Sequence, residues 1–158
     1  MNLQRTGGPF IVPAAGKDIW YETEIKVVDT FDKIELFAGL SEVDTAIIDG
    51  TPSMASTNIL AFYCVTGDGV LLFAGEKAGT ASDLITTATI EEATYIDIGF
   101  RTKGITSAQA YINGVKYGAP IATAGIPIVK LVPSFVCQSF GTNDPILHVA
   151  GYRVLQLR

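Results

Sequence analysis

Apolar and polar residues alternate along much of this chain with a period of two, which is the period of a β-strand that buries one face. The clearest example is segment 18–28. Its odd-numbered positions are Ile19, Tyr21, Thr23, Ile25 and Val27, and its even-numbered positions are Trp20, Glu22, Glu24 and Lys26. We therefore predict a strand here whose second face contacts water.

Similar stretches recur at regular spacing along the rest of the chain. The further predicted strands are 34–40, 58–65, 70–76, 83–89, 93–103, 108–112, 115–117, 131–140 and 146–157. Thr66-Gly67-Asp68-Gly69 predicts the turn of one hairpin, and Asn113-Gly114 is the typical pair for a type I′ turn in another. No segment shows a convincing helical pattern.

Four segments lack this alternation. Residues 1–16 indicate an irregular N-terminal arm, 77–82 a loop, and 119–130 a crossover that contains prolines. Segment 41–57 is the longest connection, and loops of that length are uncommon in compact domains and often functional. Since no linker interrupts the rest, we predict an arm over 1–16 and a single β-sandwich domain over 17–158.

The amino-acid composition also indicates an all-β fold class, and it shows an excess of apolar residues. Val, Ile and Thr supply 45 of the 158 residues, and these β-branched types favour strands. We therefore predict an all-β protein, a two-sheet antiparallel β-sandwich or jelly roll. The chain is 48% apolar and 17% charged, against about 25% charged in an average domain, which excludes a disordered chain. This excess predicts that a partner covers part of the apolar surface.

Charge and cysteine content exclude several classes of partner. The formal net charge is −5 and no two basic residues are adjacent, which argues against nucleic-acid binding and a polybasic membrane tether. No uncharged apolar stretch reaches the ~18 residues of a membrane span. Cys64 and Cys137 have no metal or redox spacing, so we expect two buried thiols, with a long-range disulfide as the alternative. The N-terminus does not resemble a secretory signal, so we expect maturation in a reducing cytoplasm.

Residues that could perform catalysis or bind a metal are scarce. The single histidine, His148, lies in an apolar strand and is best explained as a structural or interface residue. Glu22 and Glu24 share a face about 7 Å apart and allow a glycoside hydrolase, but a polar strand face explains them better. Calcium could bind Asp44 with Asp49, or Asp68 with Asp144, although turn formation explains these residues better. We predict no enzyme activity, no cofactor and no metal.

Aromatic residues provide a weaker indication of function. Trp20, Tyr63, Tyr95, Tyr111, Tyr117 and Tyr152 are amphipathic and could stack on sugars or anchor an interface. Packing in the core is the alternative explanation for most of them.

Several motifs resemble virion proteins of tailed bacteriophages that have a concanavalin/laminin-G-like sandwich. The pattern Trp20-Tyr21-Glu22 resembles their first strand, and Glu35-Leu36-Phe37-Ala38-Gly39-Leu40-Ser41-Glu42 resembles the strand that follows. Further matching motifs are Thr94–Phe100, Ala110–Gly114, Ile126-Pro127, Pro133-Ser134 and Gly151–Val154. The resemblance covers roughly residues 7–158, and it implies a concanavalin A-like sandwich without catalytic residues.

The resemblance implies a non-enzymatic capsid decoration (cement) protein that binds the major capsid protein lattice and stabilises the head. Such a protein would lie on the outer capsid surface of the virion after assembly in the host cytoplasm, as a homo-oligomer for which a trimer is one candidate. The alternative is a carbohydrate-binding, lectin-like module of a phage tail or adsorption structure, with Trp20 or the tyrosines as the stacking platform. The candidate partner contacts are Phe10, Ile11 and Val12 in the arm, and Ile47, Ile48 and Met54 in the long connection.

Overall fold

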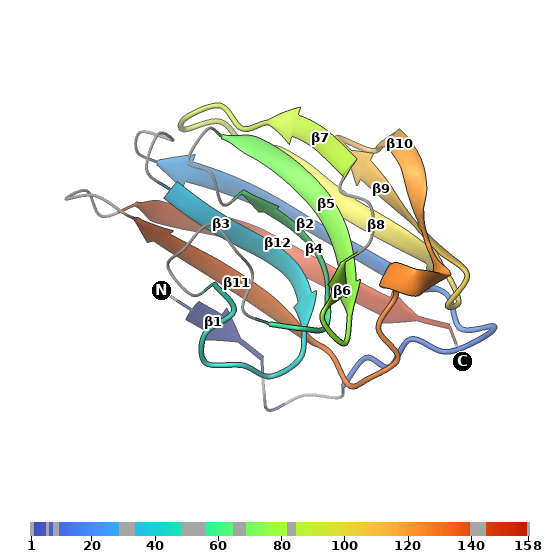
Figure 1. The fold of residues 1–158 in the computed structure, drawn as a ribbon. Helices are drawn as coiled ribbons and strands as arrows, with labels where there is room; N and C mark the ends of the chain where they lie inside the picture. Colours follow the sequence, from blue (N-terminus) through green and yellow to red (C-terminus); the bar gives the residue numbers. More distant parts are fainter. Residues whose placement is uncertain are drawn as a thin grey trace.

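The computed structural model describes residues 2–5, 7, 10–28, 34–48, 56–64, 69–81, 85–139 and 145–157. Within these residues the chain forms two antiparallel sheets that pack face to face, as Figure 1 shows. This arrangement confirms the predicted all-β sandwich. No helix in the described part of the chain is long and apolar enough to cross a membrane.

The first sheet has seven strands and the second has five. In spatial order the seven-stranded sheet contains β1 (Asn2–Gln4), β11 (Val132–Ser139), β3 (Ile34–Ser41), β4 (Ile59–Cys64), β5 (Val70–Lys77) and β6 (Thr80–Ala81), and β7 (Ile85–Thr89) also pairs with β5. The five-stranded sheet contains, in order, β10 (Val115–Ala122), β9 (Ser107–Ile112), β8 (Ile96–Lys103), β2 (Ile19–Val28) and β12 (Ile146–Gln156). One 3₁₀ turn, Thr123–Gly125, follows β10.

The main core lies between the two sheets. Every odd-numbered position of β2 is buried there, and the even-numbered side chains of β2 lie on the opposite face, as the alternation predicts. The ring of Tyr21 stacks on Phe100 of β8 with centroids 5.0 Å apart. Phe73 of β5, in the other sheet, packs against the Phe100 ring with centroids 5.5 Å apart. Aromatic contacts therefore join the two sheets at their centre.

Both predicted hairpins form. β4 pairs with β5, although the connecting residues 65–68 lie outside the described part of the chain. β9 pairs with β10 through Asn113 and Gly114, whose φ angles are 49° and 74°. Positive φ at both positions is what a type I′ turn requires, and Asn-Gly is the pair that tolerates it.

Outside the N-terminal residues, three details differ from the sequence prediction. The expected loop 77–82 contains a tight turn into β6, because Ala78 and Gly79 both adopt positive φ. β10 continues to Ala122 through a register shift between Tyr117 and Ile121. Pro120 lies within this shift, and an edge strand tolerates a proline at such an irregularity. β8 begins at Ile96 because the residues just before it form a turn.

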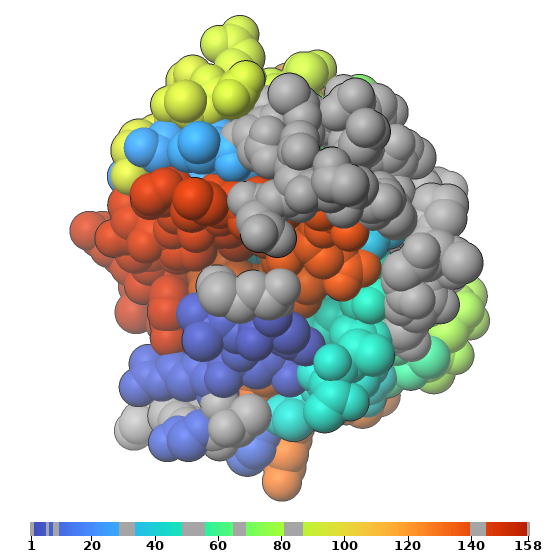
Figure 2. Space-filling view, turned by 90° about the vertical axis from the view of Figure 1, so that its left-hand side faces the viewer, coloured from blue at the N-terminus to red at the C-terminus, as the bar shows by residue number. Residues whose placement is uncertain are grey.

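The N-terminal residues are partly built into the sandwich. β1 pairs with β11 at the edge of the seven-stranded sheet, so residues 2–4 are a strand rather than irregular arm. The side chain of Gln4 donates to the hydroxyl oxygens of Ser41 and Ser134, both at 3.0 Å, and Asn2 donates to the carbonyl of Asp44. In Figure 2 the dark blue N-terminal residues accordingly lie beside the teal segment around residues 41–48.

A second cluster of buried apolar residues covers the outer face of the seven-stranded sheet. Every residue of β3 and β4 is buried, so these two strands have no wet face. Phe37 and Tyr63 pack there against Ile47 and Ile48 from the connection after β3. Part of the apolar excess therefore packs within the chain itself.

The two cysteines are buried thiols, as expected. Cys64 of β4 and Cys137 of β11 both lie beside Leu36 of the intervening strand β3. Two strand spacings separate their Cα atoms by roughly 10 Å, which is too far for a disulfide.

Candidate functional site

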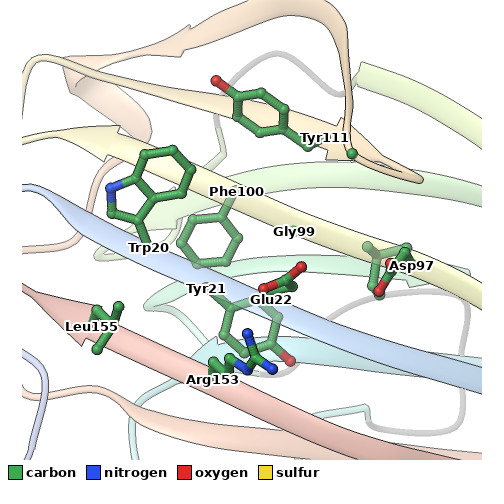
Figure 3. Close-up of a pocket in the computed structure, with 11 residues that line it drawn as sticks. Trp20, Tyr21, Glu22, Asp97, Gly99, Phe100, Tyr111, Arg153 and Leu155 are labelled. Carbon is green, nitrogen blue, oxygen red and sulfur yellow. The ribbon is translucent and has the colours of Figure 1, made fainter.

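The outer face of the five-stranded sheet contains a pocket of about 500 Å³. Figure 3 shows that β2, β8, β9 and β12 all contribute to it. The side chains that point into or border it are Trp20, Glu22, Asp97, Tyr111, Arg153 and Leu155. Because strands alternate, the polar face of β2 supplies Trp20 and Glu22 while Tyr21 points into the core.

Strand register places a glycine in the floor of this pocket. Glu22 lies between Arg153 of β12 and Gly99 of β8, and Gly99 in turn lies beside Tyr111 of β9. A Cβ atom at position 99 would lie 2.7 Å from the carbonyl oxygen of Tyr21, so the backbone packing admits no side chain there. The missing side chain leaves room above the sheet between Glu22 and Tyr111.

Two aromatic rings border this space. The rings of Trp20 and Tyr111 have centroids 6.2 Å apart and planes inclined by 27°. Trp20 keeps 43% of its surface exposed, although a tryptophan side chain is normally mostly buried. The pair therefore presents a partly exposed aromatic surface to any ligand in the pocket.

The position of Trp20 is supported by a charged pair beside the pocket. The guanidinium carbon of Arg101 lies 4.9 Å from the centre of the Trp20 ring, and Arg101 also forms an ion pair of 2.9 Å with Asp18. The hydrogen bond from Arg101 and a second from the Gly104 backbone N–H lower the pKa of the Asp18 carboxyl. These contacts restrict the rotamer of Arg101 and, through it, the tilt of the indole.

Polar groups of both signs surround the aromatic pair. Asp97 is fixed by its backbone, because its carbonyl accepts from Asn113 N–H at 2.9 Å and its N–H donates to the Asn113 side chain at 3.1 Å. Within the described residues, Glu22, Asp97 and Arg153 form no ion pair. Two carboxylates and one guanidinium are therefore available to a ligand.

The structure separates the two glutamates that allowed a hydrolase. Glu22 lines the pocket, whereas Glu24, two residues further along β2, lies outside its lining. Glu22 and Asp97 are the two carboxylates that the pocket brings together, and both are exposed to solvent. A carboxyl that acts as a general acid is usually desolvated, which is not the environment of either residue.

The candidate calcium ligands are described only in part. The Asp44 carboxylate accepts from the backbone N–H of Ala46, which is the turn contact expected of it. Asp49, Asp68 and Asp144 lie outside the described residues. No group of three or more His, Cys, Asp or Glu side chains in the described part of the chain could hold a metal ion.

The predicted partner contacts have different environments. Phe10 and Val12 are exposed, and Ile11 is half-buried and pairs with Leu131. Ile47 and Ile48 are buried against the outer face of β3 and β4, so a partner would reach them only if the connection moved. Met54 lies outside the described residues, and the role of all six as partner contacts stays a prediction.

Sequence reasoning identified part of the pocket. The sequence indicates Trp20, Tyr111 and Glu22 as candidate residues, but it gives no such indication for Gly99, Asp97 and Arg153. The alternation of residues 93–103 places Asp97 and Gly99 on one face of a strand, so the sequence does predict that they share a face. What was missing is the order of strands β9-β8-β2-β12, which brings these residues together.

Comparisons with known proteins show the fold. No protein-family model matches the chain, and no curated protein matches it. Among solved structures, sheep galectin-11 in complex with glycerol has a TM-score of 0.56 at 11% identity, over 93% of this chain and 95% of that one. The β-glucanase of Bacillus licheniformis has a TM-score of 0.60 at 16% identity, over 94% of this chain and 67% of that one. CG-16, a homodimeric agglutinin from chicken liver, has a TM-score of 0.51 at 12% identity, over 98% of this chain and the whole of that one.

Proposed function

We propose that this chain is a non-enzymatic carbohydrate-binding module that holds a sugar ring against Trp20 and Tyr111. The observation that carries the proposal is a half-exposed tryptophan, held by Arg101, beside a pocket with unpaired polar groups. A sugar ring has apolar C–H groups on its face and hydroxyls at its rim. The pocket offers the matching surfaces, an aromatic platform and hydrogen-bonding groups around it.

The charges in the pocket favour a neutral sugar. Glu22 and Asp97 can accept hydrogen bonds from hydroxyl groups, and Arg153 can donate to ring or hydroxyl oxygens. Two carboxylates against one guanidinium leave a net negative site, which repels a carboxylated or sulfated ligand. Strand positions hold all three groups before a ligand arrives, which reduces the ordering entropy of binding.

The shapes of the structural neighbours are consistent with this proposal. They include proteins named as a galectin and an agglutinin, and two enzymes, a β-glucanase and an alginate lyase, that are named for a polysaccharide. Identities of 11–16% support a common fold and leave the ligand to experiment.

The chain contains its own probe for the test, because Trp20 is its single tryptophan. We expect neutral oligosaccharides from a glycan panel to change Trp20 fluorescence, and Tyr111→Ala to weaken the binding found by calorimetry at least about tenfold, or ~1.4 kcal/mol. Tyr117→Ala is the control, since Tyr117 is a tyrosine of the same sheet that lies outside the pocket. Equal loss in both variants, or no response to any neutral glycan, would refute the proposal. Repeating the panel with a chelator separates calcium-dependent binding from direct binding.

A second candidate is the virion role, and the motifs shared with phage virion proteins favour it. We propose that the chain, as a homo-oligomer on the outer capsid surface, binds the major capsid protein and stabilises the head. Exposed apolar side chains such as Phe10 and Val12 in the arm would supply many weak contacts summed over a lattice.

Electron microscopy of intact particles tests this second candidate separately from sugar binding. Density for the chain at capsid symmetry axes is the expected result. Density only at the tail would leave a lectin-like adsorption role, and absence from purified particles would exclude both virion locations. The pocket variants Trp20→Ala and Tyr111→Ala should leave capsid incorporation unchanged.

A further inference from the structure

The last strand of the five-stranded sheet has an unpaired outer edge. β12 pairs with β2 on one side only, and within the described residues no strand pairs with its other side. The backbone N–H of Leu157 donates to Asp18, and hydrogen bonding alternates along an antiparallel pair. Residues 152, 154 and 156 therefore direct their N–H and C=O groups outward, away from β2.

A groove runs along this outward edge. It has a volume of about 370 Å³, and four consecutive residues of β12, Tyr152 to Leu155, form one wall. Ile11 and Pro133 form an apolar part of the opposite wall. Leu155 is 66% exposed at its rim. An edge that is long, apolar and unpaired is a template for adding another strand.

The charge of the groove is positive although the chain is acidic. Arg5 and Arg153 are its only charged lining residues among those described, and neither forms an ion pair. The guanidinium of Arg5 donates a hydrogen bond of 3.3 Å to the Tyr152 hydroxyl, and its backbone N–H donates to the carbonyl of Pro133. A second copy of this chain would bring Arg153 of its own β12 against these cations, which disfavours self-pairing.

We propose that this groove binds an extended, acidic segment of a partner protein, which adds as a further strand beside β12. The outward N–H and C=O groups of Tyr152 and Val154 would pair with the backbone of the incoming strand. Its apolar side chains would contact Ile11 and Leu155, and a carboxylate would bind Arg5. This groove adjoins the sugar pocket and shares Arg153 and Leu155 with it, whereas Arg5, Ile11 and Pro133 line the groove and not the pocket.

The test uses a fluorescein-labelled peptide of about six residues, a common strand length, that alternates valine with glutamate. A matched peptide has lysine in place of each glutamate. We expect fluorescence anisotropy to rise with the acidic peptide alone, and amide hydrogen exchange to slow at residues 152 and 154. Arg5→Glu should weaken binding at least about tenfold. Lys116→Glu, the same charge change on the exposed strand β10 at the far edge of the sheet, should change it less than about twofold.

A backbone variant tests the pairing itself. Val154→Pro removes an outward donor and keeps the bonds to β2, because proline is tolerated where a strand N–H faces solvent. We expect it to abolish peptide binding while circular dichroism and Trp20 fluorescence remain those of the parent. Equal binding of both peptides, equal loss in Arg5→Glu and Lys116→Glu, or no binding at about 1 mM would overturn the proposal. So would concentration-dependent self-association that Val154→Pro abolishes, because the occupant would then be a second copy.

Discussion

Gly39 lies in β3 directly opposite Ala61 of β4, under the apolar cluster on the outer face of the sheet. A Cβ atom at position 39 would lie 2.4 Å from the Cβ of Ala61 and 2.7 Å from the carbonyl oxygen of Leu60. Neither atom can move without shifting β4. The phage-like motif around Gly39 therefore has a packing explanation, which supports the fold rather than a particular role.

We expect Gly39→Ala to lower the free energy of unfolding by about 1–3 kcal/mol, because it overpacks a region that cannot relax. Gly151→Ala is the matched control, since a Cβ atom there meets nothing within 4 Å. Urea denaturation compares the two variants. The double variant Gly39→Ala with Ala61→Gly should recover part of the loss, and equal stability of the two single variants would contradict the argument.

Cys137 gives the fold a dependence on alkaline pH. Burial raises the pKa of the Cys137 thiol to about 11 from its ordinary 9.0. Between pH 9 and pH 11 the thiol is already ionised in the unfolded chain but still protonated in the folded chain. The free energy of unfolding is therefore highest below pH 9 and falls as the pH rises toward 11. At pH 10.5 the expected loss from this group is at most about 2 kcal/mol.

Cys137→Val removes this titration and keeps an apolar side chain. We expect the variant to lose about 2 kcal/mol less than the parent between pH 8 and pH 10.5, measured by urea denaturation at each pH. Burial also raises the pKa of Tyr63, to about 12, but that residue is present in both proteins and cancels in the comparison. Identical losses in parent and variant would show that Cys137 is not the group responsible.

At the scale of elements, β1 depends on side chains more than on its own length. It has three residues, and Gln4 connects it to β3 and β11 through Ser41 and Ser134. The Gln4 side-chain oxygen also accepts from the backbone N–H of Asp44 at 3.0 Å. One side chain therefore holds the N-terminal strand, the sheet and the start of the long connection together.

We expect Gln4→Leu to destabilise the protein by about 2 kcal/mol, because several half-buried hydrogen bonds are lost together. Asn2→Ala should cost less than about 0.5 kcal/mol, since its hydrogen bonds are longer and exposed. Urea denaturation gives both values, and limited proteolysis near residue 5 should become faster only in Gln4→Leu. An unchanged cleavage rate would mean that Gln4 does not hold β1 in place.

The same elements show what the sequence could predict. Period-two alternation locates β2 and β8 and their wet faces, and Asn113-Gly114 locates a hairpin, because both are local signals. β1 and β6 are too short for a period to appear, and they exist because neighbouring strands offer partners. For the pocket, the sequence predicts which residues of one strand share a face. It does not predict the order of the strands in the sheet, because that order depends on contacts between residues far apart in the sequence.

At the scale of the whole molecule, the two sheets differ in how they are covered. The excess of apolar residues predicts an apolar surface that a partner covers. The second cluster shows that part of this excess, including Phe37, Ile47 and Ile48, is instead buried within the chain. The seven-stranded sheet is therefore covered on both faces at β3 and β4. Among the described residues, none covers the outer face of the five-stranded sheet at the pocket or pairs with the outer edge of β12, and these are the two places where we propose ligands.

This asymmetry predicts a pattern of hydrogen exchange across the free protein. Backbone amides at the centre of β3 and β4 should exchange only through global unfolding, because both faces and both edges of these strands are covered. The outward amides of residues 152 and 154 on β12 need no opening at all, so they should exchange many orders of magnitude faster. Exchange followed by NMR in dilute solution measures both sets. Strong protection of residues 152 and 154 in the free monomer would mean that part of this chain already covers the edge, and the peptide groove would then be closed.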